Sequence, residues 1–127
     1  MENKTDRPAE GAGKLATPAA EQVARAIEYL AAALLDLEWH MLTSEQIPAD
    51  VEAFEAESLK KVGIDHPAVP PRYRTAYFAH IWGGGYSASY YAYLWSETLA
   101  ADAFAHMLAH GGCTLENGQA FRKEILS

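Results

Sequence analysis

Apolar residues recur at helical spacing through the first third of the chain. The intervals between them are 4, 3, 4, 3 and 4 residues, which is a near-heptad period. Thr17 and Pro18 stand before this stripe as an N-cap and a proline at the first helical position. The pattern predicts a helix from Pro18 to Met41; we expect its stripe to be a packing face, with an oligomer seam as the alternative. The stripe consists of Val23, Ile27, Leu30, Leu34, Leu37 and Met41.

Capping and stop signals delimit the remaining elements, and no alternating strand pattern is present in the sequence. A long helix is predicted from Ser87 to His110, ended by Gly111 and Gly112. The sequence therefore predicts an all-α fold of about four helices with a glycine-rich loop. The other predicted segments are a turn over 43–48, a helix capped by Asp50 and stopped by Gly63, a proline-broken linker over 64–71, an ambiguous segment over 72–82 that fits a short helix or an extended stretch, and a short last helix from Leu115.

Charge and composition exclude several classes of function. The net charge of −7 leaves no basic patch for nucleic acid or for a membrane surface. The apolar run from Tyr29 to Leu35 is too short to cross a bilayer. The only cysteine, Cys113, excludes an internal disulfide and suits a reducing compartment, so we expect a cytoplasmic protein. Residues 1–17 are polar and without periodicity, and we expect a disordered leader there, followed by one helical domain over 18–127.

The segment from His80 to Tyr93 is the strongest candidate for a binding site. It combines a histidine, three consecutive glycines (83–85) and four tyrosines in fourteen residues. Glycines give the backbone freedom, and tyrosine hydroxyls can donate hydrogen bonds to a ligand. Because positions 86, 90, 93 and 97 are spaced 4, 3 and 4, a helix would carry Tyr86, Tyr90, Tyr93 and Glu97 on one face. Tyr91 and Trp95 lie off that face, and we expect them to pack between helices.

His106 and His110 have the spacing of two metal ligands on one helical face. Residue 107 is methionine, however, where a zinc-binding helix would carry a glutamate. A chance pair on the surface is the expected interpretation, and an adventitious metal site is the alternative.

Further segments accompany the glycine–tyrosine stretch: Glu28-Tyr29-Leu30-Ala31-Ala32-Ala33-Leu34-Leu35-Asp36, Trp39-His40, Phe54-Glu55, Leu59-Lys60-Lys61, Pro70-Pro71-Arg72-Tyr73-Arg74, Tyr77-Phe78, Asp102-Ala103-Phe104, Gly111-Gly112, Glu116-Asn117-Gly118, Phe121-Arg122 and Ile125-Leu126-Ser127. Together they resemble the C-terminal part of the M3 family of zinc metallopeptidases, in particular its peptidyl-dipeptidase branch, related to oligopeptidase A and thimet oligopeptidase. By resemblance, His80, Gly83, Gly84, Gly85 and Tyr86 contact peptide substrate. The resemblance also implies that Tyr90 and Tyr93 face the metal in catalysis, with Tyr93 stabilising the oxyanion.

The resemblance implies zinc as the cofactor of the complete enzyme, which would release dipeptides from the C-termini of short peptides. The family's His-Glu-x-x-His motif occurs nowhere in these 127 residues, so we expect no zinc site in this chain and no peptidase activity from it alone. Two alternatives stay open. One is a self-associating helical interaction protein derived from the peptidase. The other is one half of a split enzyme whose zinc site lies on a separate chain.

Overall fold

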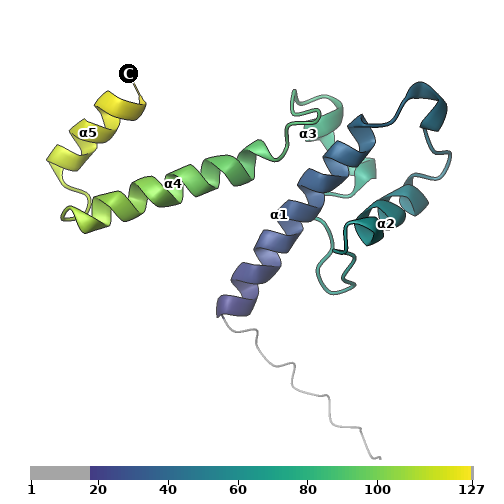
Figure 1. Cartoon of the computed structure of the whole chain (residues 1–127), viewed down its shortest axis with the longest axis horizontal. Coiled ribbons are helices and arrows are strands. Elements are labelled where there is room, and N and C mark those ends of the chain that lie inside the picture. The colour runs from purple at the N-terminus through teal and green to yellow at the C-terminus, as the bar shows by residue number, and fades with distance from the viewer. Residues whose placement is uncertain (1–17, 127) are drawn as a thin grey trace, which may run out of the picture.

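A computed structural model describes residues 18–126, and within that range the chain folds into helices without a named strand (Figure 1). The all-α class is therefore confirmed, and only an isolated bridge between His66 and Val69 interrupts it. The predicted leader over residues 1–17 lies outside the described residues, as does Ser127. The elements are α1 (Pro18–His40), the 3₁₀ turn η1 (Ser44–Gln46), α2 (Val51–Lys61), the 3₁₀ turn η2 (Thr75–Tyr77), α3 (Ala79–Trp82), α4 (Ala92–Ala109) and α5 (Leu115–Ile125).

Local signals account for most of the helix ends. The Asp50 side chain accepts a hydrogen bond from the Ala53 amide at 2.9 Å and so caps α2, and Gly63 beyond its last turn has a φ of +75°. Gly111 and Gly112 adopt φ values of +93° and +84°, which end α4 as predicted. Thr114 then caps α5 by accepting from the Asn117 amide at 3.2 Å.

The buried face of α1 is its alanine face, and the prediction for its packing stripe is wrong. Ala32 and Ala33 pack against Phe78, Ile81 and Tyr90 to form the core cluster. Because the alanine side chains are small, the segment that carries Phe78, Ile81 and Tyr90 lies close to α1. The larger side chains of that segment then fill the core. The stripe residues are half-buried or exposed, with Val23 58% and Met41 65% exposed.

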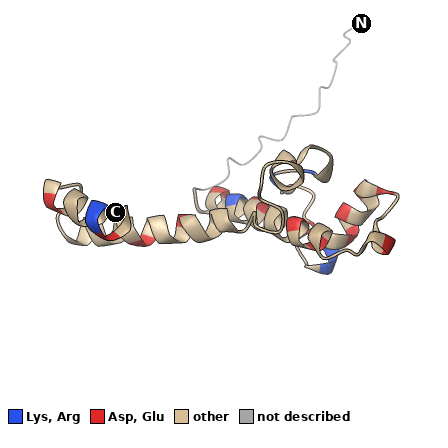
Figure 2. Cartoon of the chain, turned by 90° about the horizontal axis from the view of Figure 1, so that it is seen from above, with Lys and Arg blue, Asp and Glu red and all other residues tan. Residues whose placement is uncertain are grey.

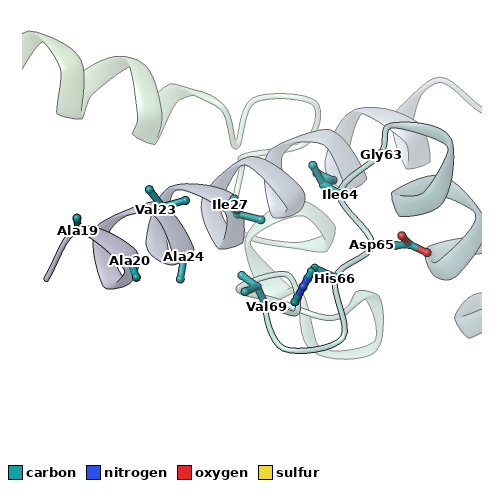
Figure 3. Close-up of a pocket in the computed structure, with 10 residues that line it drawn as sticks. All are labelled: Ala19, Ala20, Val23, Ala24, Ile27, Gly63, Ile64, Asp65, His66 and Val69. Carbon is teal, nitrogen blue, oxygen red and sulfur yellow. The ribbon is translucent and has the colours of Figure 1, made fainter. Parts of the chain in front are cut away.

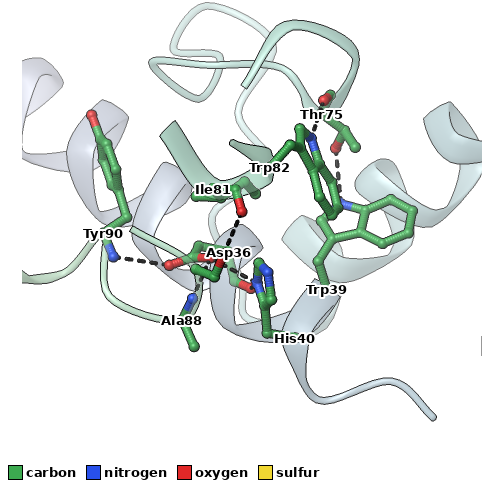
Figure 4. Close-up of polar contacts among 9 residues, drawn as sticks. Asp36, Trp39, His40, Thr75, Ile81, Trp82, Ala88 and Tyr90 are labelled. Atoms are coloured by element: carbon green, nitrogen blue, oxygen red, sulfur yellow. Dashed lines mark hydrogen bonds and ion pairs between the residues drawn. The ribbon is translucent and has the colours of Figure 1, made fainter. Parts of the chain in front are cut away.

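A buried carboxylate on α2 organises the segment that the sequence leaves ambiguous. Glu55 accepts from the Thr75 amide at 2.8 Å, from the Thr75 hydroxyl at 2.9 Å and from the Arg74 guanidinium at 2.9 Å. The indole of Trp39 donates to the Thr75 hydroxyl, and the indole of Trp82 donates to the Thr75 carbonyl (Figure 4). The segment is thus two short helical turns, η2 and α3, tied to both α1 and α2.

The helix α4 begins at Ala92, five residues later than the predicted start at Ser87. Residues 87–91 form turns, because Ala88 has a φ of +54°, which is incompatible with a right-handed helix. Tyr86 and Tyr90 consequently lie before the helix. The prediction that Tyr86, Tyr90, Tyr93 and Glu97 share one helical face is therefore wrong, and Glu97 is exposed.

The helices α4 and α5 lead away from the rest of the structure (Figure 1). Neither has a buried residue, and the predicted packing of Tyr91 and Trp95 is wrong, since these side chains are 54% and 65% exposed. The side-chain amide of Asn117 donates to the carbonyls of Met107, His110 and Gly112, at and just beyond the end of α4, and so ties the two helices together. Most of α4 is uncharged (Figure 2). Of the helices in residues 18–126, none is both long and apolar enough to cross a membrane.

Candidate functional site

The predicted histidine and tyrosines come together as one aromatic cluster. Tyr93 lies on the long helix α4, and His80 lies in the four-residue helix α3. Tyr86 stacks on Tyr93 with ring centroids 5.0 Å apart, and Tyr90 contacts Tyr93 at 5.0 Å. The His80 ring lies 5.7 Å from Tyr90, 6.2 Å from Tyr93 and 6.1 Å from Tyr86. Tyr73, which the sequence does not single out, packs at 4.8 Å from His80. The rings of four tyrosines therefore gather around one imidazole.

Two of the phenols hold their protons unusually tightly. Burial, reinforced by Tyr73, raises the pKa of Tyr90 to about 12. A hydrogen bond with Tyr86, together with burial, raises the pKa of Tyr93 to about 12. Both groups are therefore neutral hydrogen-bond donors across the whole physiological pH range.

The glycine loop is a folded turn over the end of α3. The amides of Gly83 and Gly84 both donate to the Ala79 carbonyl at 3.0 Å, and the Tyr86 amide donates to the His80 carbonyl at 3.1 Å. A side chain at Gly84 would come within 2.9 Å of the His80 backbone, and Gly85 has a φ of +81°. These two glycines are needed for close approach and for turn geometry. The sequence alone indicates only that these glycines give the backbone freedom.

Asp36 on α1 anchors the other side of the tyrosine segment, and the sequence analysis assigns it no role. Its fully buried carboxylate accepts from the Ala88 amide and from the Tyr90 amide, each at 2.9 Å (Figure 4). His40 Nδ1 lies 2.8 Å from both this carboxylate and the Asp36 carbonyl, so Nδ1 carries a proton. In the sequence Asp36 is one acidic residue between two leucines of a helical segment, and nothing else there marks it.

Arg72 is a second residue that the sequence analysis does not select. Its guanidinium lies 4.4 Å from the centroid of the Tyr29 ring, and the Tyr29 ring stacks on Tyr90 at 6.3 Å. Desolvation lowers the pKa of Arg72, but a hydrogen bond with Tyr73 and the phenols of Tyr29 and Tyr90 outweigh it and raise the pKa. A full positive charge thus borders the tyrosine cluster.

A groove and a smaller hollow open on the surface of the described residues, and the hollow includes His80. A groove of about 700 Å³ runs between the first half of α1 and the loop after α2 (Figure 3). It is mostly apolar and lies away from the tyrosines, so we assign no chemistry to it. A hollow of about 570 Å³ is lined by Ala79, His80, Trp82, Gly83 and Gly84, beside the cluster. Of the candidate residues, His80, Gly83 and Gly84 line this second hollow, and the tyrosines do not.

No group of three or more histidine, cysteine, aspartate or glutamate side chains within residues 18–126 is arranged to hold a metal ion. His106 and His110 stack with ring centroids 4.1 Å apart, and His110 Nδ1 is bonded to the His106 carbonyl at 2.8 Å. This part of the chain therefore does not fit the zinc ion that the resemblance implies.

Comparisons with known proteins agree with the resemblance. The model of the family described as peptidase family M3 matches residues 7–127. The chain is 53% identical over 100 residues to the dipeptidyl carboxypeptidase of Escherichia coli (strain K12), and 54% identical over 100 residues to that of Salmonella typhimurium (strain LT2). Each match covers 79% of this chain and 15% of the relative, so the chain spans only a small part of the length of these proteins.

Proposed function

Because the chain belongs to peptidase family M3, we propose that it is the substrate-binding segment of a peptidase and that its ligands are short peptides. One observation carries this proposal. His80, Tyr86, Tyr90 and Tyr93 converge beside a glycine turn and an open hollow. Tyrosine and histidine rings near an open surface offer a peptide apolar contact, and tyrosine hydroxyls offer hydrogen bonds.

The proposed roles follow from protonation and burial. We propose that the Tyr93 phenol, which is half-buried and has a pKa of about 12, donates a hydrogen bond to the oxygen of the scissile carbonyl. One well-placed donor of this kind contributes roughly 3 kcal/mol to a transition state. Tyr90 is 2% exposed, so we propose that it chiefly supports Tyr93. His80 and the glycine turn would contact the peptide backbone, and movement of the turn over the ligand stays a prediction.

The family's zinc ion finds no matching set of ligands within residues 18–126. The residues present do not fit the ion, and we derive no step of the reaction through it. We propose that the zinc-binding residues come from another part of a family enzyme, on the same or a separate chain, and that these 127 residues alone do not hydrolyse peptides. A cytoplasmic location remains a proposal from the single cysteine.

Two measurements on the purified chain test the proposed function. The first is binding of an N-acetylated alanine tetrapeptide, followed by NMR shifts of the tyrosine ring protons. We expect saturable shifts that the Tyr86→Ala and Tyr93→Ala variants reduce, while Tyr77→Ala, an exposed tyrosine outside the cluster, leaves them unchanged. The second is cleavage of the same peptide with added zinc and with a chelator. Chelator-sensitive release of a dipeptide would contradict the predicted inactivity, and the absence of any binding would contradict the peptide-binding role.

A second candidate function, helical self-association, is supported by the exposed apolar side chains of α4. Trp95, Leu99, Phe104 and Leu108 are 65%, 55%, 54% and 59% exposed. We therefore expect concentration-dependent association in sedimentation velocity. The Trp95→Glu variant should weaken it, and Ser96→Glu, which adds the same charge at an exposed polar position, should not. A wild-type chain that sediments as a monomer at all concentrations would remove this candidate.

A further inference from the structure

The end of α4 carries two histidines that the proposed function does not use. His106 and His110 stand one helical turn apart, and both are exposed to solvent. Their rings stack with centroids 4.1 Å apart and an angle of 28° between the ring planes. The sequence favours a chance pair at this spacing. The structure adds that the two imidazoles touch, so that one ion could reach both.

The backbone fixes the tautomer of His110. Its Nδ1 lies 2.8 Å from the carbonyl oxygen of His106. Because a carbonyl only accepts, Nδ1 carries the proton, and Nε2 of the neutral ring keeps its lone pair. A metal-binding histidine commonly donates its other ring N–H to a backbone carbonyl, which orients the ring and makes it more basic. His110 thus already makes the outer contact that a metal ligand needs.

The histidine of α1 shows the same backbone contact with a different neighbour. His40 Nδ1 lies 2.8 Å from the carbonyl of Asp36, four residues earlier, and 2.8 Å from the Asp36 carboxylate. For His110 the residue four positions earlier is His106, and no hydrogen bond within residues 18–126 engages a ring nitrogen of His106. Where α1 pairs an imidazole with a carboxylate, α4 therefore places a second imidazole with a lone pair of its own.

A small side-chain movement would let one ion bind both rings. Two nitrogens bound to one metal ion at about 2.1 Å, with about 90–109° between the bonds, lie about 3.0–3.4 Å apart. The ring centroids are 4.1 Å apart, so the exposed side chains need to close by only about 1 Å, which side-chain motion allows.

The electrostatics at this end of α4 favour a cation. Asp102 is exposed one turn before His106, on the same side of the helix. His110 is the C-cap of α4, where the helix dipole attracts positive charge. The helix contains no lysine or arginine that would repel a cation.

We propose that His106 and His110 together bind one divalent transition-metal ion of the kind that imidazole prefers, such as Ni²⁺ or Cu²⁺, with water completing its coordination. The ion would clamp the last turn of α4. The side-chain amide of Asn117 donates to the Met107 and His110 carbonyls, so the same turn ties α5 to α4. Metal binding should therefore stabilise this connection. The site does not depend on peptide binding at the tyrosine cluster.

Isothermal titration of the 127-residue chain with Ni²⁺ tests the site. We expect one bound ion per chain and no comparable binding of Mg²⁺, which prefers oxygen ligands. His106→Gln and His110→Gln should each raise the dissociation constant for Ni²⁺ about ten-fold or more, because one of two ligands is lost. His66→Gln removes an exposed histidine outside α4 and should change this constant less than about two-fold. Glutamine is a good helix former, so the variants should keep α4, which far-ultraviolet circular dichroism checks.

NMR of the wild-type chain gives a second measurement that needs no variant. The chain has five histidines, and paramagnetic Ni²⁺ should broaden the ring protons of His106 and His110 at lower concentrations than those of the others. Amide hydrogen exchange in the last turn of α4 should slow when Ni²⁺ is bound, because the clamp opposes local opening.

Three results would overturn the site. One is a Ni²⁺ affinity of His106→Gln equal to that of the wild type, which means that a single ring binds the ion. Another is loss of binding in Cys113→Ser, which assigns the ion to the exposed thiol. The third is equal broadening of all five histidines, which shows only general attraction to a chain of net charge −7. None of these results bears on peptide binding.

Discussion

Replacing Asp36 tests whether the tyrosine cluster is held in place from α1. The carboxylate is fully buried and accepts from two amides and one imidazole. Removing it in Asp36→Ala leaves the Ala88 and Tyr90 amides without an acceptor and returns Ala88, at a φ of +54°, to its intrinsic preference for negative φ. The segment before α4 should then loosen as a unit.

The size of the effect follows from the contacts. A hydrogen bond to a charged group contributes about 1.5–3 kcal/mol, and an amide left buried without a partner costs a similar amount. For the two amide contacts, Asp36→Ala should lower the free energy of unfolding by about 3–6 kcal/mol. Asp36→Asn keeps the shape and one acceptor oxygen, so we expect about half that loss. Native domains have a free energy of unfolding of about 5–15 kcal/mol, so the alanine variant would lose much of it. The asparagine variant stays folded more readily and is the better one to measure.

Urea unfolding followed by far-ultraviolet circular dichroism measures the loss, and near-ultraviolet dichroism reports the tyrosines separately. Glu57→Ala, an exposed acidic residue on α2, is the matched control and should change the unfolding free energy by less than about 0.5 kcal/mol. If Asp36→Asn loses no more than Glu57→Ala and keeps the wild-type tyrosine signal, the anchoring argument is refuted.

Two further predictions concern the loop and the phenols. Gly84→Ala should lower the free energy of unfolding by about 1–3 kcal/mol because its Cβ meets the His80 backbone at 2.9 Å, whereas Gly83→Ala, with nothing within 4 Å, should have little effect; urea titration of the pair decides. Because the pKa values of Tyr90 and Tyr93 rise from 10 to about 12 on folding, the stability they contribute is complete below pH 10 and is lost between pH 10 and 12. Tyrosinate absorbance against pH should show this late titration, and a Tyr93 group that titrates near 10 in the folded chain would contradict it.

The helices were predictable because their ends are written in local chemistry. Asp50 caps α2, Gly111 stops α4 and Thr114 caps α5, and each of these signals acts over a few residues. The start of α4 was not predictable in the same way. Ser87 begins a good helical pattern, but Asp36, which is 52 residues from Ala88 in the sequence, draws the Ala88 and Tyr90 amides out of helical geometry. A contact over that separation leaves no mark in a sequence window.

The candidate site, too, is predictable where it depends on local sequence and unpredictable where it depends on distant contacts. The glycines and tyrosines of 80–93 are recognisable from their composition and from the family resemblance, and the rings do meet. Their arrangement depends on Asp36 and Glu55, two buried carboxylates that hold the two sides of the segment and that look like ordinary surface residues in the sequence. The prediction of a packing stripe on α1 was wrong for a related reason. Periodicity counts large apolar residues, while the core here uses Ala32 and Ala33 to admit rings from elsewhere.

The exposed apolar residues of α4 limit what can cover this helix. Trp95 and Phe104 are nine residues apart, as are Leu99 and Leu108, and nine residues are about two and a half turns at 3.6 residues per turn. Trp95 and Leu99 therefore form a pair on one side of the helix, and Phe104 and Leu108 form a pair on the opposite side. A single partner helix covers one stripe, so a simple two-helix contact between copies of the chain would leave the other pair in water. Protein packed on both sides of α4 would cover both pairs. Self-association of this chain alone would have to use two faces of the helix.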